Sequence, residues 1–212
     1  MKAMRTVPRA LVAAALVAAT ISCGNVVRSG RAPVVLVVDS VLAIRGSAQA
    51  SGTATSFLSS DVFTLVTTGG TCTTAAPCPT VFSDAGRATL HIVLKDIGLP
   101  GTTPSPSTNN EVTVTRVHIS YRRTDGRNQE GVDVPYGFDT GSTITVTSTT
   151  GVAIDFPLVR IQAKQEAPLM ALRSNGQVIS VIADVTFYGS DLVGNAMTAT
   201  GSIAIDFANF GD

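Results

Sequence analysis

Two long stretches near the carboxyl terminus, 178–187 and 196–207, alternate between apolar and polar side chains. Successive side chains of a β-strand point to opposite faces, so each stretch predicts a strand with one apolar and one polar face. The segment GSDLVGN (189–195) between them is rich in turn-forming residues, which predicts a hairpin. The alternating apolar positions are Ile179, Val181, Ala183, Val185 and Phe187, followed by Met197, Ala199, Ile203, Ile205 and Phe207.

Four earlier segments also predict strands: 34–44, 61–68, 87–96 and 111–123. In the last of these the apolar phase slips by one residue, which predicts a β-bulge near Thr115–Arg116. Only 162–173 has any helical character, and Pro168 interrupts it. We therefore expect an all-β antiparallel sandwich, with 34–212 as a single domain and 98–110 as a long loop. A linker between two smaller domains is the alternative for that loop.

Part of this pattern resembles a known class of domain. VHISYRRTDGRN (117–128) and ADVTFYGSDLVGNAMTATGSIAIDF (183–207) are similar to strands of bacterial immunoglobulin-like and fibronectin-type-III-like domains. Such domains often end in a hairpin with an Asp-x-x-Gly-Asn turn, which is found here at 191–195. The resemblance implies an immunoglobulin-like β-sandwich, although the chain has no tryptophan for the sandwich core. It implies a fold and a setting, not an activity.

The amino-terminal segment predicts export. Residues 1–9 are basic, and the apolar stretch 10–21 is shorter than the roughly 20 residues that a membrane span needs. Its length is typical of a signal peptide, here 1–22. The sequence Thr20-Ile21-Ser22-Cys23 resembles the lipobox of bacterial lipoproteins, in which the cysteine becomes the lipidated first residue. The resemblance implies a lipid on Cys23 and a tether over 23–33, with ordinary signal cleavage as the main alternative.

The cysteine count supports this assignment. An exported chain with three cysteines leaves one unpaired, and a lipid on Cys23 would leave Cys72 and Cys78 to pair. These two lie in a loop rich in Gly, Pro and Thr, where a disulfide would restrain the backbone. No histidine or further cysteine stands nearby to complete a metal site, so we expect no metal and no cofactor. In the lipoprotein resemblance, Gly24 after the cysteine favours the outer membrane, because an aspartate there tends to mean inner-membrane retention.

Charge argues against nucleic acid as a partner. Acidic and basic residues number 15 each, and three of the basic ones precede Cys23. A chain that begins at Cys23 would carry 12 basic against 15 acidic residues, a formal charge of −3.

The strongest catalytic motif is FDTGS (138–142), which resembles the Asp-Thr-Gly signature of aspartic proteases. In such an enzyme Asp139 would be the catalytic carboxylate, and a homodimer would supply the second one. The segment before it contains Asp133, Pro135 and Gly137, so a turn leading into a strand at TITVTST is the preferred interpretation.

Other candidate sites are weaker. His91 and His118 lie within strand patterns and are expected to be satisfied by the sheet. The loop 124–133 carries Asp125, Asn128, Glu130 and Asp133, oxygen ligands without EF-hand spacing, and we interpret it as a solvated turn. Glycan binding would require exposed aromatic side chains, and the chain offers Tyr121, Tyr136 and Tyr188.

These observations predict a lipid-anchored protein of the cell envelope. The domain would face the periplasm or the cell surface and act without catalysis, as a structural or protein-interaction module for an envelope or surface protein. The alternatives are a homodimeric retropepsin-like protease that uses Asp139 and a glycan-binding adhesin.

Overall fold

The computed structural model describes residues 30–47, 52–96, 106–147 and 149–211. The predicted signal peptide, Cys23 and most of the loop 98–110 lie outside these ranges. Within them, no helix is long and apolar enough to cross a membrane.

Three strands form the first sheet, in the order β1 (Val34–Ile44), β5 (Asp84–Leu94) and β8 (Val152–Val159). All the pairings are antiparallel, and β1 carries a register shift between Val38 and Ser40. The alternation predicted for 87–96 is confirmed, because Ala88, Leu90 and Ile92 are fully buried.

Five strands form the second sheet, in the order β2 (Phe57–Asp61), β10 (Ala196–Ala208), β9 (Ile179–Asp191), β6 (Val112–Arg122) and β7 (Phe138–Val146). The predicted hairpin is confirmed as β9–β10. The predicted bulge in β6 is also confirmed, since the register with both neighbours shifts between Val114 and Arg116. The short β2 runs parallel to β10 at the edge of the sheet.

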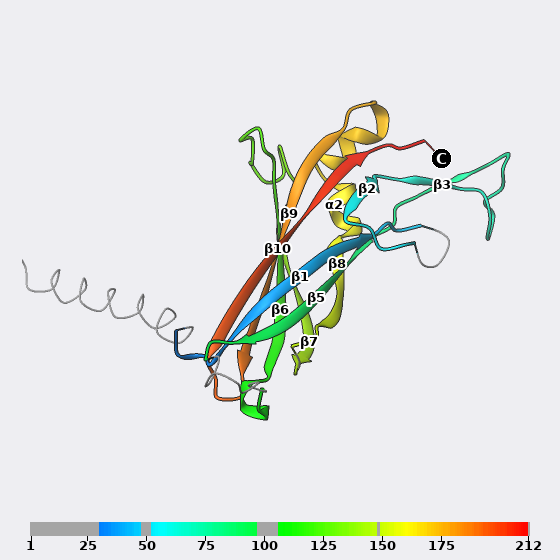
Figure 1. The fold of residues 1–212 in the computed structure, drawn as a ribbon. Coiled ribbons are helices and arrows are strands. Elements are labelled where there is room, and N and C mark those ends of the chain that lie inside the picture. The colour runs from blue at the N-terminus through cyan, green and yellow to red at the C-terminus, as the bar shows by residue number, and fades with distance from the viewer. Residues whose placement is uncertain (1–29, 48–51, 97–105, 148, 212) are drawn as a thin grey trace, which may run out of the picture.

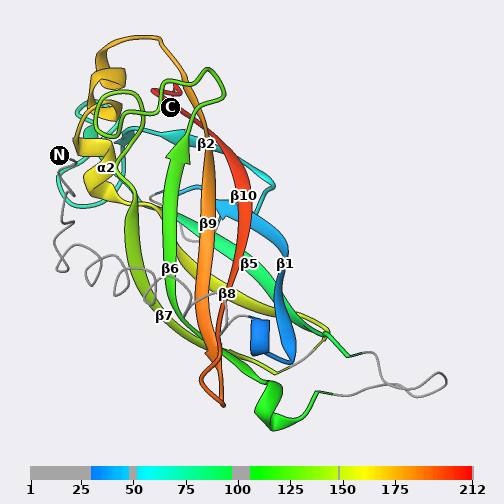
Figure 2. The ribbon, with the colours of Figure 1, turned by 90° about the vertical axis from the view of Figure 1, so that its left-hand side faces the viewer.

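The two sheets pack face to face, so the predicted all-β sandwich is confirmed. Figure 1 shows β1 and β5 beside the larger sheet, and Figure 2, turned by 90°, shows β6, β9 and β10 in front of β5 and β8. The apolar residues between the sheets form one buried cluster, which stabilises the fold by removing apolar surface from water. Phe187 of β9 contacts Phe156 of β8 edge to face across this core, with the ring centroids 5.7 Å apart.

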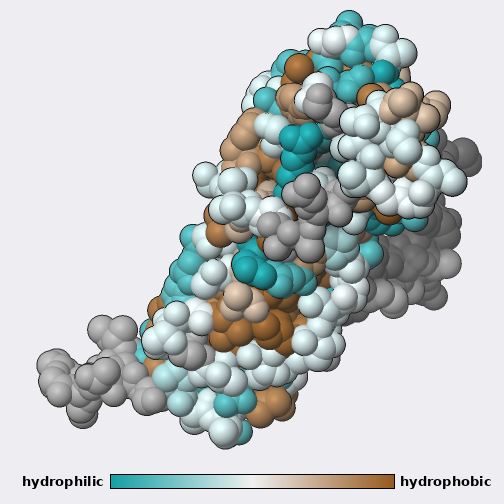
Figure 3. Space-filling model, turned by 90° about the vertical axis from the view of Figure 1, so that its right-hand side faces the viewer, coloured by the Kyte–Doolittle hydropathy of each residue, from teal (hydrophilic) through white to brown (hydrophobic). Residues whose placement is uncertain are grey.

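Figure 3 views the outer face of the three-stranded sheet and shows an apolar area in its lower half. Val35 of β1 and Val93 of β5 are paired across this sheet and are 43% and 44% exposed.

Three short helices and a small hairpin complete the described part of the fold. Helix α2 (Ile161–Gln165) and the 3₁₀ helices η1 (Thr108–Asn110) and η2 (Leu169–Ser174) are short. The peptide bond before Pro168 is cis, and this proline separates α2 from η2 as predicted. The hairpin consists of β3 (Thr64–Val66) and β4 (Cys78–Thr80).

Two predictions are wrong in detail. The strand expected over 61–68 is divided into β2 and β3, with Val62 fully buried at the break. The motif FDTGS is not a turn but the first part of β7, paired with β6 through Phe138, Asp139, Thr140 and Gly141. The polar side chains of that segment fit a strand because β7 is an edge strand with one solvated face.

Candidate functional site

One end of the sandwich holds three of the four charged residues that are buried in the described part of the chain: Asp61, Asp84 and Lys164. We call it the α2 end and define it by Arg45, Ser60, Asp84, Lys164 and Arg173. The other end, where β9 turns into β10 and β1 begins, is the hairpin end (Figures 1 and 2).

A buried ion pair lies at the centre of the α2 end. Lys164 Nζ is 2.8 Å from Asp84 Oδ2, and the two side chains are 1% and 0% exposed. Burial lowers the pKa of Lys164 because it disfavours the charged ammonium, and the Asp84 carboxylate partly opposes this effect. The pair connects the short helix after β8 to the first residue of β5.

Asp84 also accepts two neutral hydrogen bonds. Ser60 Oγ donates to Oδ2 at 2.6 Å, and the Gly46 amide donates to Oδ1 at 2.8 Å. Ser60 belongs to β2, so this carboxylate ties the five-stranded sheet to the three-stranded one. Asp61, the next residue, is 2.8 Å from Arg45 Nη2 and accepts from the Phe210 amide at 3.3 Å.

A serine, an aspartate and a lysine in contact suggest nucleophilic catalysis, but their burial argues against it. A nucleophile must reach a substrate. Here Ser60 and Asp84 are 0% and 1% exposed as residues and Lys164 is 1% exposed, so no substrate reaches them. We interpret the network as an internal connection between the sheets.

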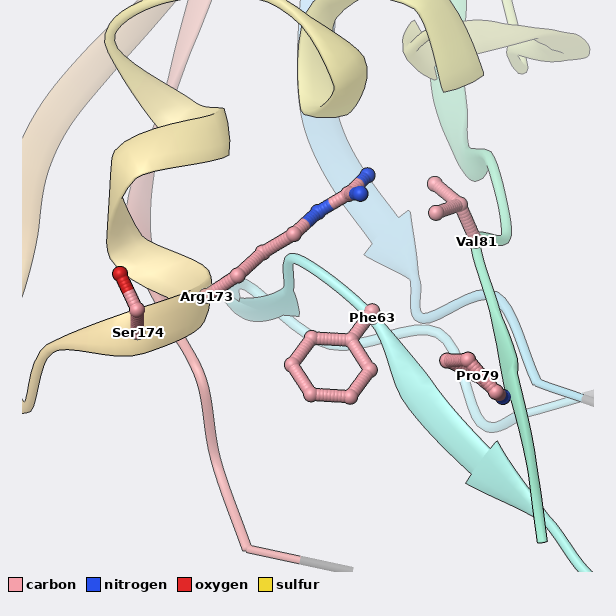
Figure 4. Close-up of a pocket in the computed structure, with 5 residues that line it drawn as sticks. All are labelled: Phe63, Pro79, Val81, Arg173 and Ser174. Carbon is pink, nitrogen blue, oxygen red and sulfur yellow. The ribbon is translucent and has the colours of Figure 1, made fainter.

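A hollow of about 260 Å³ lies beside this network. Figure 4 shows Phe63 and Pro79 on one side and the Arg173 side chain reaching across toward Val81, while the Ser174 hydroxyl points away. Arg173 Nη2 donates to the carbonyl oxygen of Lys164 at 3.1 Å. Arg173 Nε is buried and has no hydrogen-bond partner among the described residues.

This combination of groups suits one side chain of a partner. Small-molecule sites usually enclose roughly 300–1,000 Å³, so the hollow is smaller than most of them. Aromatic residues and arginine are enriched at protein–protein interfaces, and Phe63 and Arg173 supply both here. The hollow is therefore our candidate interaction site.

The disulfide hairpin forms one wall of the hollow. Cys72 and Cys78 are joined, with their Cα atoms 5.3 Å apart, as the cysteine count predicts. Cys78 begins β4 and directly precedes Pro79, which lines the hollow. The disulfide therefore restrains the strand that positions Pro79.

Removal of this disulfide is expected to loosen the hairpin. Closing so short a loop restricts the unfolded segment by an amount equivalent to about 2 kcal/mol. In a Cys72→Ser/Cys78→Ser variant, amide hydrogen exchange over 64–80 should become faster, while β9 and β10 keep the protection of the wild-type protein. Equal exchange of 64–80 in both proteins would contradict the restraint.

The structure places Asp139 on the exposed outer face of the five-stranded sheet. Arg116 Nη1 donates to Asp139 Oδ1 at 3.1 Å, and His118 Nδ1 is 3.2 Å from the same oxygen. An aspartic protease uses two aspartate carboxylates that share a proton. Here a second copy of the chain would have to supply the second carboxylate. The geometry around Asp139 is that of a surface ion-pair network.

The other candidate residues have protein partners. His91 Nδ1 is 2.7 Å from Asp39 Oδ1, so both histidines contact an aspartate.

In the loop 124–133, Asp125 accepts hydrogen bonds from Arg123 and Arg127, which hold the pKa of its carboxyl well below the usual value. Three more oxygens of this loop accept backbone amides: Asn128 from Arg123, Asp133 from Gln129, and Glu130 from Gly137. No group of three possible metal ligands occurs in the described ranges.

The tyrosines do not form a common platform. Tyr121 is buried, and its hydroxyl donates to the Leu158 carbonyl at 2.6 Å. Tyr188 lies beneath the Arg116 guanidinium, 3.7 Å from ring centroid to Cζ, whereas Tyr136 is half exposed.

Comparison with known proteins adds no family. No protein-family model matches the chain, and no curated protein or solved structure is significantly similar to it.

Proposed function

We propose that the protein is an exported lipoprotein of the cell envelope, anchored through Cys23, whose β-sandwich acts without catalysis as a structural or protein-interaction module. The observation that carries this proposal is the Cys72–Cys78 disulfide. Structural disulfides form and persist in oxidising compartments outside the cytoplasm. Pairing of these two leaves Cys23 alone, one residue beyond a twelve-residue apolar stretch of signal-peptide length.

The arrangement of the two ends supports an interaction role. β1 begins at the hairpin end, so an anchor at Cys23 joins the domain there. The hollow beside Arg173 lies at the α2 end, away from the anchor. A partner in the periplasm or at the cell surface would therefore approach the hollow without obstruction from the membrane. We favour the outer membrane because Gly24, not aspartate, follows the cysteine.

Metabolic labelling with a clickable fatty acid tests the anchor. The wild-type protein should be labelled and recovered with the outer-membrane fraction. Cys23→Ala should lose the label completely, because no other cysteine follows the apolar stretch at the right spacing. The control is the Cys72→Ser/Cys78→Ser variant, which should retain the label. Equal, background labelling of the wild type and Cys23→Ala would contradict the proposal.

A further inference from the structure

The β9–β10 turn exposes two adjacent aliphatic side chains. Leu192 is 61% exposed and Val193 is 69% exposed, the two highest values among the large apolar residues that the structure describes as exposed. An apolar phase that covers these two side chains would remove their surface from water, which is favourable.

The turn holds these side chains in a fixed position. Asp191 Oδ1 accepts the amides of Val193 at 3.1 Å and Asn195 at 2.7 Å, and Oδ2 accepts Asn195 Nδ2 at 2.7 Å. Gly194 adopts a φ of 91°, which glycine tolerates without strain. A preorganised tip loses little conformational entropy when it binds.

The tip lies at the end of the molecule to which the chain's amino-terminal segment connects. Figures 1 and 2 both place the β9–β10 turn next to the beginning of β1, and Pro33 at that beginning accepts the Lys95 amide. Six residues, 24–29, lie between Cys23 and Gly30, the first described residue, and the segment from Cys23 to Gly30 spans at most about 25 Å. A lipid on Cys23 would therefore keep this end close to the bilayer.

Apolar contact, not charge, would drive the interaction of this end with a bilayer. Arg31 and Lys95 are at the hairpin end, but Asp96, Glu111 and Asp191 are also there, so these five residues give no excess of positive charge. Val35 and Val93 extend the exposed apolar surface along the adjoining sheet.

We propose that Leu192 and Val193 insert into the surface of the bilayer that carries the lipid anchor and so orient the domain with its α2 end facing away. This inference rests on the proposed function, because the anchor supplies the proximity. The tip contacts the acyl region of a phospholipid bilayer, and this contact does not depend on anionic headgroups.

The absence of tryptophan from the whole sequence makes a direct test possible. Leu192→Trp introduces a single reporter at the tip, and Met170→Trp introduces one at the α2 end, where Met170 is 52% exposed. Each full-length lipidated variant is reconstituted into phosphatidylcholine vesicles with brominated acyl chains. Leu192→Trp should show blue-shifted emission and strong quenching, whereas Met170→Trp should emit as in water without quenching. Adding phosphatidylglycerol should leave both signals unchanged.

The result that overturns the inference is a Leu192→Trp signal that matches Met170→Trp in a membrane-bound, lipidated protein. Quenching of Leu192→Trp only when phosphatidylglycerol is present would also overturn it, since that would mean electrostatic docking. Failure of the anchor itself is separate, because it appears as an unlabelled wild-type chain in the fatty-acid experiment. Val193→Trp provides a second reporter at the tip and should behave as Leu192→Trp does.

Discussion

Lys164→Met is expected to lower the free energy of unfolding by about 3–5 kcal/mol. Methionine has a similar length and keeps the packing of α2, but it removes the cation that lies 2.8 Å from Asp84 Oδ2. The carboxylate then stays buried with only Ser60 and the Gly46 amide as partners. Urea titration of the wild type and variant measures the loss as a lower transition midpoint.

Two further variants separate the ion pair from general effects of losing a lysine. Lys95→Met removes an exposed lysine and should change stability by no more than about 0.5 kcal/mol. Asp84→Leu combined with Lys164→Met should recover part of the stability of the single variant, because replacing a whole buried pair costs less than breaking it. A neutral Lys164→Met, or a double variant that is the less stable of the two, would contradict this account of the α2 end.

Phe187→Ala is expected to lower the free energy of unfolding by about 3–5 kcal/mol. Its ring is fully buried in the middle of β9 and contacts Phe156 of the opposite sheet. Truncation would leave a cavity between the two sheets and remove the aromatic contact that connects them. Thermal unfolding should show a clearly lower midpoint.

The matched control is Phe57→Ala in the edge strand β2. Phe57 is 44% exposed, so its removal takes away less buried area and should cost much less than Phe187→Ala. Equal losses for the two variants would mean that the face-to-face packing of the sheets is not the main source of stability.

The strands that the sequence predicts well are those with a strict local pattern. The alternation from Ile179 to Phe207 indicates the hairpin because every second residue is apolar and a single turn separates the two runs. The slip of phase near Thr115 predicts the bulge for the same reason. Such signals depend on neighbours in sequence and do not need knowledge of the tertiary fold.

The α2 end was not predictable in this way. β2 has the sequence Phe-Leu-Ser-Ser-Asp, and its buried Ser60 and Asp61 resemble turn residues until their partners are known. Those partners come from distant parts of the chain: Asp84 lies 24 residues from Ser60, and Lys164 lies far beyond both. Arg173 likewise has no local signal that places it in a hollow, since the wall opposite comes from the β3–β4 hairpin.

The motif FDTGS was predicted as a turn but forms a strand. Glycine, serine and aspartate there predict a turn by composition, yet the segment pairs with β6. An edge strand tolerates these residues because its outer face and its free edge are solvated. Composition indicates the solvated environment of this segment but not its backbone conformation.

The mass of the amino-terminal peptide of the membrane-extracted protein shows whether Cys23 is the lipidated first residue. We expect a mature chain that begins at Cys23 and carries a diacylglyceryl group on that cysteine. A mature chain with an unmodified Cys23 thiol, or one that begins after Cys23, would contradict it.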